Sequence, residues 1–69
     1  MKKSEFILSN LACEHCIARV SKAVKKLKGV KSHNIDLKNL SVEYDENKIT
    51  DQDIINTVTE LGYGAQLKE

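Results

Sequence analysis

Hydrophobic residues recur with two different periods along the first half of the chain. In "SEFILS", residues 4–9, apolar and polar positions alternate, which predicts a strand with Phe6 and Leu8 on its buried face. From about Glu14 the spacing becomes helical, and one apolar stripe flanked by Ala23 contains Ile17, Val20, Val24 and Leu27. Gly29 follows as a stop signal for this helix.

Two further apolar runs predict a hairpin in the middle of the chain. Residues 30–37 indicate a strand with Ile35 and Leu37 on one face. Residues 40–45 indicate a second strand whose inward positions are Leu40, Val42 and Tyr44. Only Lys38-Asn39 separates these runs, so we expect a tight turn at those two residues.

The last twenty residues predict a second helix and a short final strand. Thr50 has the character of an N-cap, and Asp51 and Asp53 follow where the helix dipole favours acids. The buried stripe of this helix is Ile54, Val58 and Leu61, flanked by Ile55, and Gly62 ends it. In "YGAQL", residues 63–67, we expect Ala65 and Leu67 to point inward.

The resulting order is βαββαβ, which predicts an α+β fold of the ferredoxin-like sandwich type. A four-stranded antiparallel sheet would carry two helices on one face, and residues 1–69 would form a single domain. Strand alternation also places His33 on the inward face, where we expect a partly buried, hydrogen-bonded side chain.

Composition and charge narrow the function classes. With 41% hydrophobic and 30% charged residues, the chain is typical of a folded globular domain. Its net charge of +1 is too modest for a nucleic-acid binder, and no apolar run suggests direct membrane insertion. The apolar stretch Phe6–Leu8 is too short for a signal peptide, so we expect a cytoplasmic protein with reduced thiols.

Cys13 and Cys16 are the only two cysteines, and they lie where the first strand passes into the first helix. Unpaired backbone N–H groups and the positive end of the helix dipole stabilise thiolates at such a position. A separation of three residues lets both sulfurs face one point, an arrangement that suits a soft, thiophilic ion.

Other uses of a C-x-x-C pair fit less well. A structural zinc site needs about four ligands, whereas the cysteines and His15 offer three at best, and His33 lies far along a strand. The chain has no proline, so it lacks the cis-proline that faces the cysteines in thioredoxin-like proteins, and Ile17 replaces the histidine of a haem-attachment motif. The residues alone favour a metal clamp and leave a redox pair or two inert cysteines as alternatives.

Four motifs in this order resemble the heavy-metal-associated domain family, and within it the small bacterial copper chaperones of the CopZ type. "NLACEHC" is similar to the family's G-M-x-C-x-x-C loop, "KGV" follows the first helix, "VEYD" fits the third strand, and "ELGYGA" fits the end of the second helix. The resemblance covers essentially the whole chain. Its early C-x-x-C and late L-G-Y together are more specific than C-x-x-C alone.

The resemblance implies a non-enzymatic metallochaperone that binds Cu(I) between Cys13 and Cys16. The ion would pass by thiolate exchange to a metal-binding domain of a copper-transporting P-type ATPase, or to a copper-responsive repressor. The protein would be a monomer, and two thiolates leave the ion accessible enough for a copper-bridged dimer. The family offers two alternatives. The ion could be Hg(II), which also prefers paired thiolates, or the chain could be part of a transporter.

Near the cysteines the chain departs from the family pattern. Asn10-Leu11 replaces the usual Gly-Met: asparagine tolerates positive φ, and Leu11 has a volume suited to packing under the loop. Ala12 stands where zinc-transporting relatives often carry aspartate, which favours Cu(I). His15 is expected to face solvent, with a role in metal exchange or as a weak third ligand as the alternative. By resemblance Tyr63 would shield the metal; a half-buried aromatic that covers the core edge is the other interpretation.

The first helix also carries basic residues opposite its apolar stripe. Arg19, Lys22 and Lys26 recur at helical spacing and begin near the cysteines. A solvated helix face explains them, and so does a docking surface for an acidic partner domain.

Overall fold

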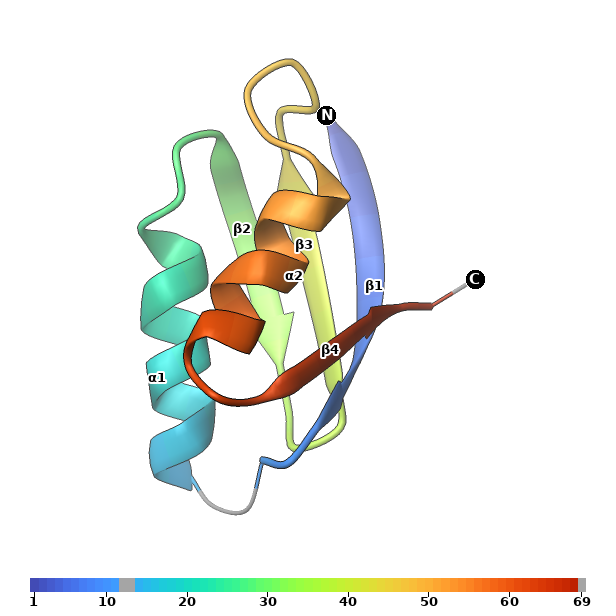
Figure 1. Cartoon of the computed structure of the whole chain (residues 1–69). Coiled ribbons are helices and arrows are strands. Elements are labelled where there is room, and N and C mark those ends of the chain that lie inside the picture. The colour runs from blue at the N-terminus through green and yellow to red at the C-terminus, as the bar shows by residue number, and fades with distance from the viewer. Residues whose placement is uncertain (12–13, 69) are drawn as a thin grey trace.

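Six elements alternate along the chain in the order β1 (Lys2–Ser9), α1 (Glu14–Lys25), β2 (Val30–Ile35), β3 (Asn39–Tyr44), α2 (Asp51–Glu60) and β4 (Gly64–Leu67). A computed structural model describes residues 1–11 and 14–68. Its strands form one sheet in the order β2-β3-β1-β4, and all three pairings are antiparallel. Both helices lie on the same face of this sheet (Figure 1). The predicted ferredoxin-like sandwich is therefore confirmed.

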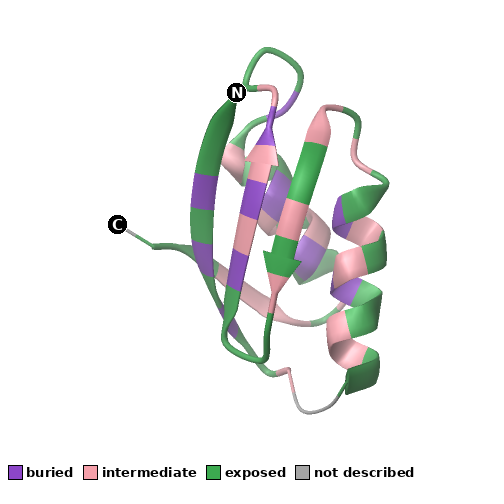
Figure 2. Ribbon diagram, turned by 180° about the vertical axis from the view of Figure 1, so that it is seen from behind, coloured by how far each residue is buried: buried purple, intermediate pink, exposed green. Residues whose placement is uncertain are grey.

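Alternation along the strands sorts side chains between the helices and solvent. In β1 the side chains of Ser4, Phe6 and Leu8 are buried, whereas Glu5 and Ile7 are exposed on the uncovered face. The buried bands recur at every second residue of β1 and β3 in Figure 2. The core between the sheet and the helices consists of Phe6, Leu8, Val20, Val24, Leu40, Val42, Tyr44, Ile49, Ile54 and Val58.

The second helix begins and ends as its sequence predicts. The Thr50 side chain accepts a bond of 3.3 Å from the Asp53 N–H, and the Asp53 carboxylate accepts one of 2.9 Å from the Thr50 N–H. This capping box satisfies two backbone donors that a helix start leaves without helical partners. After Leu61 the chain turns at Gly62, whose φ of +95° is unfavourable for residues with a Cβ.

The β2–β3 turn lies one residue earlier than predicted. The Asp36 N–H donates to the Asn39 carbonyl over 2.9 Å, so the turn is centred on Leu37-Lys38 and Asn39 already belongs to β3. The Asp36 carboxylate accepts hydrogen bonds from the backbone N–H groups of Lys38 and Asn39 at 2.8 and 2.7 Å. These two bonds lower the pKa of Asp36 and close an Asx turn that ends β2 at Ile35.

Two residues predicted to point inward are more exposed than expected. Leu37 is 49% exposed because it lies in this turn and not in the strand. Leu67 pairs with Phe6 and shares its face of the sheet, but it remains 37% exposed near the end of the edge strand β4. Ala65, on the same strand, does pack against the core.

His33 joins β2 to the helix above it. Its Nε2 lies 2.5 Å from the Ser21 hydroxyl of α1, and both residues are half-buried. The prediction of a hydrogen-bonded histidine on the inward face is confirmed.

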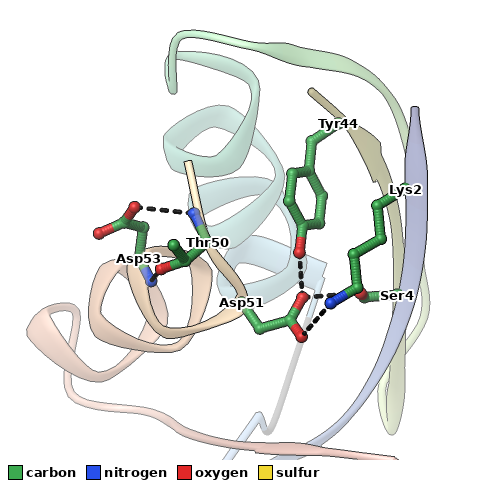
Figure 3. A network of polar contacts seen from close by, with 6 residues as sticks. All are labelled: Lys2, Ser4, Tyr44, Thr50, Asp51 and Asp53. Carbon is green, nitrogen blue, oxygen red and sulfur yellow. Dashed lines mark hydrogen bonds and ion pairs between the residues drawn. The ribbon is translucent and has the colours of Figure 1, made fainter. Parts of the chain in front are cut away.

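A polar cluster that the sequence did not indicate ties the start of α2 to two strands (Figure 3). One carboxylate oxygen of Asp51 accepts hydrogen bonds from the hydroxyls of Tyr44 and Ser4, the latter at 2.7 Å. The other oxygen accepts one from the Lys2 ammonium at 3.1 Å. Burial raises the pKa of Asp51, but the bonds from Tyr44, Ser4 and Lys2 outweigh it and hold that pKa below its ordinary value.

Within residues 1–11 and 14–68, no helix has the length and apolar character needed to cross a membrane.

Candidate metal centre

The predicted metal-binding cysteines, Cys13 and Cys16, occur where the sequence passes from β1 into α1. Asn10 has a φ of +66°, in the left-handed region where asparagine is tolerated best after glycine, so it does replace the glycine of the family motif. Leu11 is half-buried and packs against the core. Ala12 and Cys13 lie outside the described residues. Cys16 lies in the first turn of α1 and is half-buried.

Tyr63 lies in the turn between α2 and β4, which passes beside α1 in both views of the ribbon (Figures 1 and 2). Its hydroxyl forms a hydrogen bond with the Cys16 side chain, and this bond raises the pKa of Tyr63. Desolvation adds to the rise, whereas a hydrogen bond with Arg19 opposes it. The fold therefore brings Tyr63, 47 positions later in the sequence, onto one of the two predicted sulfur ligands.

His15 is exposed beside Cys16 at the start of α1. Among residues 1–11 and 14–68, no three His, Cys, Asp or Glu side chains gather closely enough to hold a metal ion. Of the two predicted sulfur ligands, the structure therefore describes Cys16, which is half-buried and lies beside Tyr63.

The three predicted docking residues are exposed: Arg19 and Lys22 lie on α1, and Lys26 directly follows its last residue. Arg19, Lys22 and Lys26 line one shallow depression together with Ala23 and Leu61 at the end of α2. We call this surface the basic depression. It begins one helical turn from Cys16 along α1.

Two contacts of the site were missed from the sequence. The influence of Arg19 on the pKa of Tyr63 joins residues from different elements, and spacing within α1 carries no sign of it. The close approach of β4 to β1 was also missed: a Cβ at Gly64 would lie 2.0 Å from the Ser9 hydroxyl oxygen. A glycine directly after the tyrosine in "YGA" was the available signal, since glycine often marks a place where backbones approach closely.

Comparison with known proteins gives a consistent result. The model of the heavy-metal-associated domain matches residues 5–64. The copper chaperone CopZ of Enterococcus hirae is 36% identical over 67 residues, which cover 94% of this chain and 97% of that protein. A copper-exporting P-type ATPase of Bacillus subtilis is 32% identical over 97% of this chain, a match that takes up 9% of the transporter.

A solved structure supports the same relationship. The apo form of the Enterococcus hirae copper chaperone superposes with a TM-score of 0.87 at 33% identity, covering 94% of this chain and 98% of that one. Sequence and fold therefore agree over nearly the full length of both chains, and the chain belongs to the heavy-metal-associated domain family.

Proposed function

We propose that this protein is a copper chaperone that binds one Cu(I) between the thiolates of Cys13 and Cys16 and delivers it to a partner. The match to the Enterococcus hirae chaperone, which covers nearly all of both proteins, carries this proposal. The position of Cys16 in the first turn of α1 supports it, because the helix N-terminus favours a thiolate there. Paired soft thiolates suit Cu(I).

Delivery is possible because an ion that is held by only two thiolates can accept a further ligand. A partner thiolate forms a new Cu–S bond, one Cu–S bond to the chaperone then breaks, and a second exchange completes the transfer. Copper stays Cu(I) throughout, so the step needs neither an oxidant nor an enzymatic group.

The relatives support a particular kind of partner. The matching segment of the Bacillus subtilis copper exporter shows that such transporters contain domains similar to this chain. We propose a domain of this kind as acceptor, and a copper-responsive repressor as a second acceptor. A copper-bridged dimer is part of the same proposal, since it uses the same accessible ion.

The proposal assigns roles to the neighbouring residues and a place in the cell. Leu11 packs under the loop without binding metal, Ala12 brings no carboxylate to the ion, His15 faces solvent, and Tyr63 shields the ion. Residues 1–69 act as one metal-binding domain in the cytoplasm, as is expected for a protein that must keep its thiols reduced.

Charge reversal in the basic depression tests delivery separately from binding. We expect the Lys22→Glu/Lys26→Glu variant to pass Cu(I) to an acidic acceptor domain about tenfold more slowly at low salt, because electrostatic steering is lost. Its affinity for Cu(I) should stay within twofold of the wild type. Stopped-flow transfer and a chelator competition measure the two quantities.

The matched control is Lys25→Glu/Lys28→Glu, which makes the same charge change at exposed residues that do not line the depression. Transfer by this control should be clearly faster than by the first variant, and the difference should shrink as salt is added. Equal transfer rates for the two variants at low salt would show that the basic depression does not dock the acceptor.

A further inference from the structure

Strand β1 continues past the end of its neighbour β4. The pairing with β4 covers Phe6–Ser9, and the Lys68 N–H adds one further bond, of 2.8 Å, to the Glu5 carbonyl. The preceding residues of β1, Lys2–Ser4, pair with β3 on their other side. Figure 1 shows the N-terminal end of β1 extending beyond β4. In the described part of the chain, the β4 side of Lys2–Ser4 is therefore an open sheet edge.

The backbone of Lys3 points to this open edge. In an antiparallel ladder the N–H and C=O of one residue point to the same neighbouring strand, and successive residues alternate between the two neighbours. Because the Glu5 carbonyl points to the β4 side, both backbone groups of Lys3 do so too. Among residues 1–11 and 14–68, no group pairs with them. They offer one donor and one acceptor to a further strand.

A groove accompanies the open edge. We call it the edge groove, and it is lined by Lys2, Lys3, Ser4, Glu5, Asp51, Leu67 and Lys68. A second depression shares Lys2, Asp51 and Leu67 with it and continues toward α2. Ile49 and Ile55 line that second depression, and Leu67 is the side chain that β4 leaves partly exposed. Apolar surface therefore lies on the helix side of the position that an added strand would take.

Charges on the uncovered face favour an acidic residue in such a strand. Lys3 and Glu5 point to this face. Glu5 lies opposite Lys68 in the ladder, and Glu43, opposite Lys3 on β3, forms an ion pair of 3.6 Å with Lys31. Within the described residues Lys3 has no ion pair. An acid directly opposite Lys3 in an added strand supplies one, whereas a lysine there is repelled.

We propose that the edge groove binds an extended segment of a partner protein, which adds to β1 in antiparallel direction and continues the line of β4. The segment exchanges two backbone hydrogen bonds with Lys3. Its residue opposite Lys3 is acidic, and the residues on either side are apolar and face Leu67 and Ile55. The main-chain bonds provide affinity, and the alternating side chains provide specificity.

The edge groove lies far from the predicted metal site. The start of β1 and the start of α1 are at opposite ends of the molecule (Figure 1), and Cys16 is in the first turn of α1. A segment bound at the edge therefore leaves the cysteine end open. The inference goes beyond the proposed function and does not require copper.

The first test titrates the isotope-labelled, metal-free protein with the acetylated and amidated peptide Val-Glu-Val-Glu-Val and follows backbone amide shifts by NMR. We expect the largest shifts at Lys3, Glu5 and Leu67. N-methylation of both glutamates removes the donor of the edge bonds and should weaken binding about tenfold. Replacing both glutamates of the peptide by lysine should weaken binding about threefold to tenfold.

A charge swap tests the contact with Lys3. Lys3→Glu should reverse the preference, so that this variant binds the lysine peptide more tightly than the glutamate peptide. Lys25→Glu is the matched control, because it makes the same change at an exposed residue outside the groove and should keep the wild-type preference. Circular dichroism verifies that both variants fold. An equal change of preference in the two variants would mean that net charge alone attracts the peptide, and the proposal would be wrong.

Two other results would overturn strand addition. Shifts confined to Lys22 and Lys26, or equal affinity for the N-methylated peptide, would place the peptide in the basic depression or leave it without edge bonds. If the amides of Lys3 and Glu5 shift with protein concentration in the absence of peptide, a second copy of this chain covers the edge. Because these measurements use metal-free protein, a failure to bind Cu(I) would refute the proposed function and leave this inference standing.

Discussion

The Cys16→Ser variant is expected to lose its affinity for Cu(I) by roughly a thousandfold or more, because serine offers a neutral, hard oxygen in place of a soft anionic sulfur. The fold should survive, since the side chain at position 16 is only half-buried in the first turn of α1. A competition titration with a Cu(I) chelator measures the affinity, and circular dichroism verifies the fold.

Ala18→Ser is the matched control for this change. It also introduces a serine into α1, at an exposed position, and removes no sulfur. Its affinity should equal that of the wild type. Retention of Cu(I) by Cys16→Ser within tenfold of the wild type would remove Cys16 from the ligand set.

The second large effect is expected on stability. Asp51→Ala should lower the free energy of unfolding by about 2–4 kcal/mol, because it leaves the buried hydroxyls of Tyr44 and Ser4 without their acceptor. The exposed Lys2 ammonium adds little to this loss. The total free energy of unfolding of a protein domain is only about 5–15 kcal/mol, so urea unfolding would readily measure this change.

The same carboxylate predicts how stability depends on pH. The pKa of Asp51 is lower in the folded protein than its ordinary value, so its contribution is present above the unfolded pKa of about 3.9 and is lost as pH falls through the folded pKa. Asp51→Asn lacks this ionisation. The stability difference between the wild type and Asp51→Asn should therefore be constant above about pH 5 and shrink below it.

Glu46→Gln is the control for general effects of acid, since Glu46 is an exposed acid near the same end of the molecule. Its stability should follow that of the wild type over the whole pH range. A difference between the wild type and Asp51→Asn that stays the same down to pH 2 would show that the Asp51 cluster carries no ionisation-dependent stability.

Periodic patterns made most of the fold predictable. The alternation around Phe6, the helical stripe containing Val20 and Val24, and the cap at Thr50 each depend on neighbours close in the sequence, and each is confirmed. The end of β2 was misplaced because the Asp36 carboxylate competes for backbone N–H groups, and a hydrophobic pattern does not register that competition.

Contacts between distant side chains were not predictable in the same way. Tyr44 was correctly placed inward, but the partner of its hydroxyl, Asp51, was interpreted only as a helix-dipole acid. A buried tyrosine needs a hydrogen-bond partner, and this requirement could have prompted a search for one. For the site, the C-x-x-C spacing indicated the sulfur ligands, whereas the influence of Cys16 and Arg19 on the pKa of Tyr63 depends on how α1 and the turn after α2 pack.

The most direct test of the central claim is an anaerobic titration of the reduced wild-type protein with Cu(I) against a competing chelator, with Cys16→Ser beside it. The account predicts that each chain withdraws one Cu(I) from the chelator, with no accompanying disulfide reductase activity, and that the variant withdraws none. Failure of the wild-type protein to compete, or equal competition by the variant, would contradict a copper chaperone that binds its cargo through this cysteine pair.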